Sequence, residues 1–182
     1  MALAVLLPAL LAGCVQPDQN GQQDAPRTGS LENAPPRITP DGYGPVRVHM
    51  SPQDAAEALG AELLPLGPGG DTEACRVLTL SGQSEGLHFM VQDDQIVRIS
   101  DYDAPDALTA QGVGAGSSDE QIRRAYPDAT EQPAKYEPPP AHDLIVWAEP
   151  GRSGLRFEVN AEGIATALHA GDESIQLVEG CG

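Results

Sequence analysis

Apolar and polar residues alternate in two stretches of the chain, residues 87–91 and 155–159. In both, Leu, Phe and Val stand at every second position. A period of two is typical of strands that bury one face. We therefore expect these residues to face the core: Leu87, Phe89, Val91, Ile96, Leu155, Phe157, Val159 and Ile164. Their neighbours His88, Met90, Arg156 and Glu158 should lie on the opposite face.

Each alternating stretch is expected to be the middle strand of a meander. Apolar runs at residues 75–80 and 144–148 predict the preceding strands, and residues 92–95 and 160–163 predict the hairpin turns that follow. Near the C-terminus, residues 175–178 are expected to form one further strand.

A short helix is predicted before each meander. Ser51 and Ser118 stand where an N-cap belongs, and Asp54 and Gln121 follow three residues later, as a capping box or a near relative of it requires. Small or apolar residues at helical spacing come next, and a glycine or a proline ends each segment.

The two units follow the same plan, which predicts an α+β fold of two tandem repeats. Each repeat is a short helix followed by a three-stranded antiparallel meander, and the repeats share one core. Repeat 1 is expected at residues 42–106 and repeat 2 at residues 107–182. Residues 14–41 are rich in Pro, Gln, Asn and Gly, which predicts a flexible linker.

The N-terminal residues form an apolar run that ends in Leu-Ala-Gly-Cys14 and turns polar at once. The run is shorter than the ~20 residues of a membrane-spanning helix, but fits a signal h-region of ~7–15 residues. It resembles the lipobox of bacterial lipoproteins, whereas the competing interpretation is a core helix. The resemblance implies that residues 1–13 are a signal peptide and that Cys14 carries lipid, with acyl chains such as palmitate. Val15, where Asp would signal inner-membrane retention, favours the outer membrane facing the periplasm.

The net charge of the chain limits the classes of partner that we expect it to bind. The chain has 27 acidic and 10 basic residues and a net charge of −17. Nucleic acid is not expected as a partner, because phosphate binding needs basic patches. Anionic lipid would also repel such a chain, so the membrane contact is expected to depend on the lipid at Cys14.

Two cysteines remain once Cys14 is assigned to the lipid. In an oxidising compartment, an even pair predicts a disulfide between Cys75 and Cys181. A metal ligand or a catalytic thiol is the alternative, but neither residue has a His or Cys at ligand spacing.

Two motifs resemble a catalytic or a metal-binding site, but the residues around them do not fit such a site. Ser84 stands in a Gly-x-Ser-x-Gly sequence, yet a strand is expected on each side, whereas a nucleophile elbow precedes a helix. Residues 101–106 are acidic like a calcium loop, but Gly112 stands where the twelfth-position Glu belongs. We expect a hairpin loop and a polar linker here, with no metal and no cofactor.

The four histidines are not spaced as zinc ligands, and we expect them to be solvated surface residues. They are His49, His88, His142 and His169. The proline-rich stretch 133–140 is expected to be a loop, and its Lys135 and Tyr136 form the predicted contact surface.

Residues 50–60, Met-Ser-Pro-Gln-Asp-Ala-Ala-Glu-Ala-Leu-Gly, resemble the Gly-Met-Thr-x-x-x-Val-x-x-x-Leu-Gly signature of the BamE/SmpA/OmlA small lipoproteins. His49 stands at the first Gly of that signature. Two tandem copies are similar in plan to the secreted β-lactamase inhibitor protein. The resemblance implies a protein-interaction module of the cell envelope, and no binding residue can be carried over from it.

These observations favour a lipid-anchored cell-envelope protein that binds another envelope protein and is not an enzyme. The alternative is an exported inhibitor of the β-lactamase inhibitor protein type, which occupies the active site of an enzyme. A serine hydrolase that uses Ser84 is the third hypothesis.

Overall fold

The computed structural model describes residues 35–67, 74–82, 86–102 and 107–181, which belong to one compact unit. Its main element is an antiparallel sheet of eight strands in the order β4-β5-β6-β7-β11-β10-β9-β8. The strands are β4 (Leu63–Pro65), β5 (Cys75–Leu80), β6 (Leu87–Gln92), β7 (Gln95–Asp101), β8 (Thr130–Pro133), β9 (His142–Glu149), β10 (Ser153–Val159) and β11 (Ala165–Gly171).

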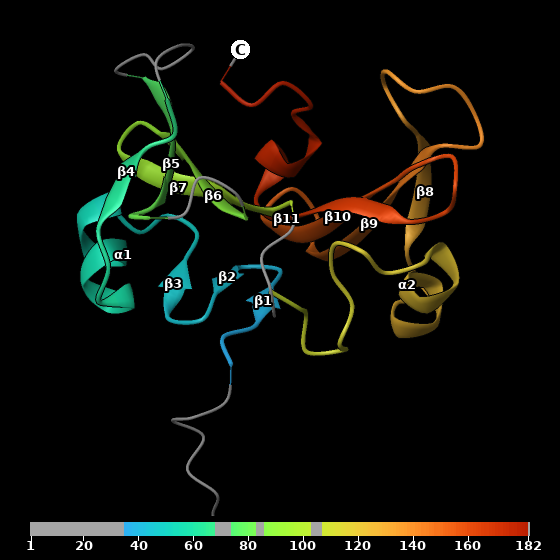
Figure 1. Ribbon diagram of the computed structural model, residues 1–182, viewed down its shortest axis with the longest axis horizontal. Helices are drawn as coiled ribbons and strands as arrows, with labels where there is room; N and C mark the ends of the chain where they lie inside the picture. Colours follow the sequence, from blue (N-terminus) through green and yellow to red (C-terminus); the bar gives the residue numbers. More distant parts are fainter. Residues whose placement is uncertain (1–34, 68–73, 83–85, 103–106, 182) are drawn as a thin grey trace, which may run out of the picture. The chain divides into compact units, whose positions relative to one another are not determined.

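The remaining elements lie on the two sides of this sheet (Figure 1). One side carries two helices and a small antiparallel sheet, namely α1 (Pro52–Leu59), α2 (Asp119–Ala125), β1 (Ile38–Thr39), β2 (Gly42–Tyr43) and β3 (Val46–Arg47). The other side carries the 3₁₀ helix η2 (Glu173–Gln176). The main core lies between the large sheet and the helices.

Both helices begin at the predicted serine caps. The Ser51 hydroxyl accepts a hydrogen bond from the Asp54 amide at 3.1 Å. At α2 the capping box is complete, because the Ser118 hydroxyl accepts from the Gln121 amide and the Gln121 side chain accepts from the Ser118 amide. Gly60 ends α1 with φ +63°, a left-handed conformation that glycine adopts without steric cost.

Seven of the eight residues predicted to face inward are buried, each at most 3% exposed: Leu87, Phe89, Val91, Ile96, Leu155, Phe157 and Val159. The prediction for Ile164 is wrong, since 38% of it is exposed. Ile164 still belongs to the turn, where the Asn160 side chain accepts its amide, and β11 begins one residue later.

The predicted fold class is wrong. The chain is mostly β, and eight strands form one continuous sheet instead of two helix-plus-meander repeats with three strands each. The halves join where β7 pairs with β11, for example Ile99 with Ala170. Strands β4 and β8 extend the sheet at its edges, and the three-stranded sheet of β1–β3 has no counterpart in the prediction.

Two further segments differ from the sequence-based expectation. Ile38 in β1 is 1% exposed and belongs to the core, although it lies in the segment expected to be a flexible linker. The prediction of a strand at residues 175–178 is wrong, because residues 173–176 form η2. The Asp172 side chain caps η2 by accepting from the Ser174 amide at 2.9 Å.

Candidate functional site

The face of the large sheet that is turned away from the main core carries a row of polar side chains, of which His88 is partly buried and the others are buried. His88, Ser100, His169 and Arg156 stand opposite one another on the successive strands β6, β7, β11 and β10. Ser100 and His169 are 2% exposed and Arg156 is 3% exposed. Buried polar groups are normally hydrogen-bonded, so the partners of this row define what the site can do.

Arg156 is the centre of a buried ion network. Its Nε donates to Asp143 Oδ2 at 3.0 Å, its Nη2 to Glu158 Oε1 at 2.6 Å and its Nη1 to the Ile175 carbonyl at 2.9 Å. Burial raises the pKa of Asp143, and the charge of Arg156 offsets only part of that shift. Removing Arg156 or its carboxylate partners would leave an uncompensated buried charge, so each of these side chains keeps the others in position.

His169 connects this network to Ser100. Its Nδ1 lies 2.8 Å from Ser100 Oγ and its Nε2 lies 3.1 Å from Glu158 Oε1. Burial lowers the pKa of His169, so the ring is neutral, donates from Nε2 to Glu158 and accepts the Ser100 hydroxyl at Nδ1. Burial raises the pKa of Glu158, but the hydrogen bond from His169 and the charge of Arg156 outweigh it and the pKa is lowered.

The sequence Ser100–His169–Glu158 resembles the order of a catalytic triad. The Ser100 residue is, however, only 2% exposed, so a substrate carbonyl cannot reach its hydroxyl in this structure. The same hydrogen bonds fix the positions of the side chains around them. The expectation that His169 is a solvated surface residue is therefore wrong.

Tyr102 lies beside this network and is exposed. It follows the last residue of β7, and 43% of it is accessible to solvent. Its ring centroid lies 5.0 Å from that of His88 and 5.7 Å from that of His169, the latter in an edge-on arrangement. An exposed tyrosine is thus held in one orientation by two histidine rings.

Residues 172–181, which we call the C-terminal segment, cover part of this face. Ile175 is fully buried, and the Ser174 hydroxyl donates to the Val97 carbonyl at 3.0 Å. The sulfurs of Cys75 and Cys181 lie 2.07 Å apart and their Cα atoms 5.5 Å apart, as the predicted disulfide requires. The segment is therefore attached to β5 at its far end.

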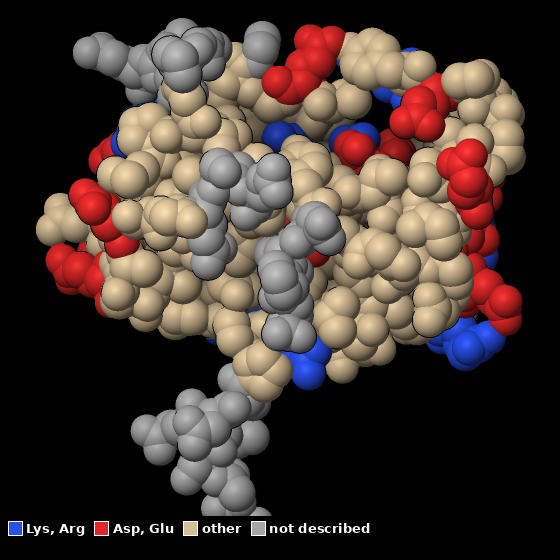
Figure 2. All heavy atoms as spheres, viewed as in Figure 1, with Lys and Arg blue, Asp and Glu red and all other residues tan. Residues whose placement is uncertain are grey.

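A cavity of about 90 Å³ lies between the sheet, the C-terminal segment and the loop from β8 to β9. Asp143, Arg156 and Glu158 line it together with Lys135 and Tyr136. Figure 2 shows acidic and basic side chains inside a hollow in the upper part of the view. The predicted contact residues Lys135 and Tyr136 thus lie beside the buried network.

Both of these loop residues contact Glu179 of the C-terminal segment. The Tyr136 hydroxyl donates to the Glu179 carboxylate, and the Lys135 Nζ lies 3.9 Å from it. Tyr136 nevertheless remains 62% exposed. The loop is therefore fixed to the C-terminal segment while its aromatic ring stays accessible.

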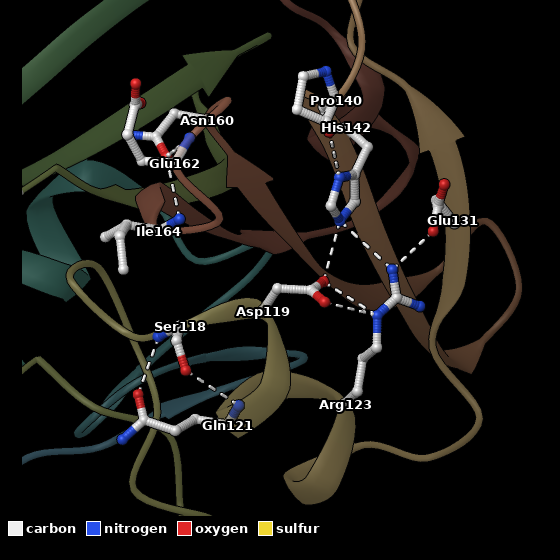
Figure 3. A network of polar contacts seen from close by, with 10 residues as sticks. All are labelled: Ser118, Asp119, Gln121, Arg123, Glu131, Pro140, His142, Asn160, Glu162 and Ile164. Atoms are coloured by element: carbon white, nitrogen blue, oxygen red, sulfur yellow. Dashed lines mark hydrogen bonds and ion pairs between the residues drawn. The ribbon is translucent and has the colours of Figure 1, made fainter.

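A second polar network joins α2 to strands β8 and β9 (Figure 3). Arg123 Nε donates to both oxygens of Asp119 at 2.9 and 3.0 Å, and its Nη2 donates to Glu131 at 2.6 Å. His142 Nε2 lies 2.9 Å from Asp119 Oδ1, and its Nδ1 lies 2.9 Å from the Pro140 carbonyl. Both ring nitrogens therefore face acceptors, which favours the protonated ring, and Arg123 Nη2, a cationic donor that opposes protonation, lies 3.3 Å from Nε2.

This geometry predicts that the stability of the fold depends on pH. Burial by itself lowers the pKa of His142, but the hydrogen bonds to the Pro140 carbonyl and to Asp119 outweigh it, and the pKa is raised. Stabilisation by protonated His142 is thus complete below about pH 6.5 and is lost as the pH rises through the folded-state value. We expect His142→Gln to lower the free energy of unfolding by roughly 1 kcal/mol in mild acid and by less above neutrality.

Urea denaturation of both proteins across this pH range, together with an NMR titration of His142, measures the effect. His88→Gln, which alters another histidine, is the control for a general effect of losing an imidazole. A destabilisation by His142→Gln that grows with increasing pH would contradict the assignment.

Some predicted site residues lie outside the described residues, among them Cys14, Ser84, Asp103 and Asp106. The segments flanking the Ser84 motif are strands β5 and β6, so it is not followed by a helix. Within the described ranges, no group of His, Cys, Asp and Glu residues is arranged to hold a metal ion. That part of the chain also contains no helix of the length and apolarity needed to cross a membrane.

No protein-family model matches the chain, and no curated protein or solved structure matches it either.

Proposed function

We propose that this chain is a lipid-anchored protein of the bacterial cell envelope and acts as a non-catalytic protein-binding module. The observation that carries the proposal is the pair of exposed tyrosines, Tyr102 and Tyr136. Glu158 links the surroundings of the two tyrosines. It forms a hydrogen bond with His169, whose ring contacts Tyr102, and it also lines the cavity beside Tyr136. Tyrosines held in fixed orientations bind a partner with little loss of side-chain entropy.

The buried groups between the tyrosines support a binding role more than a catalytic one. Ser100, His169, Glu158, Arg156 and Asp143 form hydrogen bonds or ion pairs with one another. A nucleophile or a general base must instead reach the substrate. The network therefore serves as a rigid support for the surface above it.

The proposed location follows from the N-terminal sequence. The apolar run and Leu-Ala-Gly-Cys14 support a lipid anchor, and Val15 supports the outer membrane with the folded unit in the periplasm. The Cys75–Cys181 pair is in keeping with an oxidising compartment. No nucleic acid and no cofactor enter this proposal.

A site-specific photo-crosslinking experiment in living cells tests the proposal. A photoreactive residue at position 102 or position 136 should capture the same envelope protein. The control position is Leu64 in β4, which is 38% exposed and lies at the edge of the sheet. Cys14→Ser should release the protein from membranes and remove the cross-link.

Capture at the Leu64 position alone, or no capture at either tyrosine position, would contradict the proposed surface. Membrane fractionation of Cys14→Ser like that of the wild type would contradict the anchor. If the captured protein is an enzyme that the purified chain inhibits, the inhibitor alternative replaces the general binding role.

A further inference from the structure

A groove of about 430 Å³ lies between the edge strand β8 and the proline-rich loop that leads to β9. Prolines and alanines form its apolar lining, namely Pro133, Ala134, Pro139, Pro140 and Ala141. The three prolines are exposed, and among the described elements no further strand lies beyond β8. An apolar surface is therefore open to solvent on the loop that also carries Tyr136.

Two carboxylates lie beside this apolar lining, those of Glu131 and Glu137. The Glu131 side chain is 58% exposed and accepts a hydrogen bond from Arg123 at 2.6 Å. Glu137 is exposed as well, and its side chain forms no hydrogen bond or ion pair with another residue in the described ranges. The carboxylate of Glu137 is thus available to a ligand in the groove.

The charges around the groove have a negative sum. The guanidinium of Arg123 is shared by two carboxylates, those of Asp119 and Glu131 (Figure 3). Together with Glu137, three carboxylates therefore stand against one guanidinium and the ring of His142. The sum stays negative whether or not that ring is protonated, so the groove attracts a cation and repels an anion.

The lysine of the same loop does not neutralise the groove. Lys135 is absent from its lining, and its Nζ lies 3.9 Å from Glu179 and 5.0 Å from the centroid of the Tyr136 ring. Figure 2 shows acidic side chains along the edge of the molecule that carries β8 and α2, at the right of the view. The net charge of −17 extends this attraction for cations to long range.

We propose that this groove binds a basic side chain, lysine or arginine, of the partner protein. Its methylene stem packs on the prolines and its charge lies beside Glu137 and Glu131. Long basic side chains bury their stems on apolar surface in this way while the charged end stays at a polar rim. The inference rests on the proposed binding role, and it assigns a basic segment to the partner next to the contact with Tyr136.

A titration of the purified chain with a lysine peptide tests the chemistry of the groove. The probe is a tripeptide with a central lysine and blocked ends, and the NMR amide resonances of Glu137, Ala141 and His142 should shift in a saturable way. The same peptide with an acetylated lysine keeps the stem and lacks the charge. Methylammonium has the charge without the long stem. Both should bind more weakly than the lysine peptide.

Two glutamate variants locate the binding. Glu137→Gln should weaken binding of the lysine peptide by about two- to five-fold, the contribution of an exposed ion pair. Glu57→Gln is the matched control, because Glu57 is also an exposed glutamate but belongs to α1, at the β4 end of the molecule (Figure 1). Both variants change the net charge equally, so a difference between them is due to the groove.

The absence of a saturable shift would overturn the proposal, as would equal binding of the acetylated peptide or equal effects of the two variants. A dimer of the chain that Glu137→Gln dissociates would overturn the assignment to a partner, because the occupant would then be a second copy.

Photo-crosslinking in cells separates this inference from the binding role. Glu137→Lys should lower the cross-linking yield from position 136 several-fold, whereas Glu57→Lys should leave it unchanged. A yield unaffected by Glu137→Lys would overturn the inference and leave the binding role intact. Lack of capture in the wild type would contradict the binding role, whereas the peptide titration still decides the chemistry of the groove.

Discussion

Phe89→Ala is expected to lower the free energy of unfolding by about 3–5 kcal/mol. Phe89 is fully buried in β6 and stands opposite Leu78 in β5 and Ile99 in β7. Removing its ring leaves a cavity beside β6, and the paired strands β5 and β7 cannot shift to fill it. Urea denaturation monitored by circular dichroism measures the change.

Ile164→Ala is the matched control, because Ile164 was predicted from the same pattern but is 38% exposed. Its loss should change stability by less than about 1 kcal/mol, as is usual for exposed positions. A loss below 1 kcal/mol for Phe89→Ala as well would show that this face of β6 does not form the core.

Replacing both Cys75 and Cys181 with Ser is expected to cost roughly 4–5 kcal/mol of stability. The two residues are 106 positions apart in sequence, and closing so long a loop restricts the unfolded chain strongly. Denaturation of the double variant, and of the wild type with and without a reductant, measures the cost. The reductant should have no effect on the stability of the double variant, which serves as its control.

The single variant Cys181→Ser separates the bond from the packing of Cys75 in β5. It should lose nearly as much stability as the double variant. A loss under about 1 kcal/mol for the double variant would mean that Ile175 and the arginine–carbonyl bonds hold the C-terminal segment by themselves.

The sequence predicted the parts of the fold that depend on local patterns. Alternation located the strands around Phe89 and Phe157, because burial of one face imposes a period of two. Ser51 and Ser118 marked the helix starts, because a serine side chain satisfies backbone amides that the helix leaves free. The pairing of Cys75 with Cys181 followed from counting the cysteines left after the predicted lipidation of Cys14, on the expectation that the chain is exported.

The arrangement of the sheet could not be read in the same way. Pairing of β7 with β11 joins residues about 70 positions apart, such as Ile99 and Ala170, and no local pattern encodes such a contact. Strand β8 is exposed at all four positions and contains Pro133, so it shows neither alternation nor high strand propensity. For these reasons the fold class was predicted wrongly.

The buried polar row was missed because one face of the sheet was expected to be solvated. Met90 and Arg156 were placed correctly on that face, yet they are 1% and 3% exposed. The C-terminal segment buries them, and its packing depends on Ile175 and on distant strands. A hint was available in the sequence, since Arg98, Arg156 and His169 each stand between two apolar residues of their strand.

The joint between β7 and β11 has four residue pairs, fewer than any other pairing that does not involve an edge strand. The C-terminal segment leaves β11, contacts β7 and is bonded covalently to β5. In mechanical terms, it connects the strands on the two sides of the β7–β11 pairing and reinforces the sheet there. Because this path is covalent, it limits how far the strands on the two sides of the pairing can move apart, so the backbone that carries Tyr102 is stiffened by a bond formed at the other end of the segment.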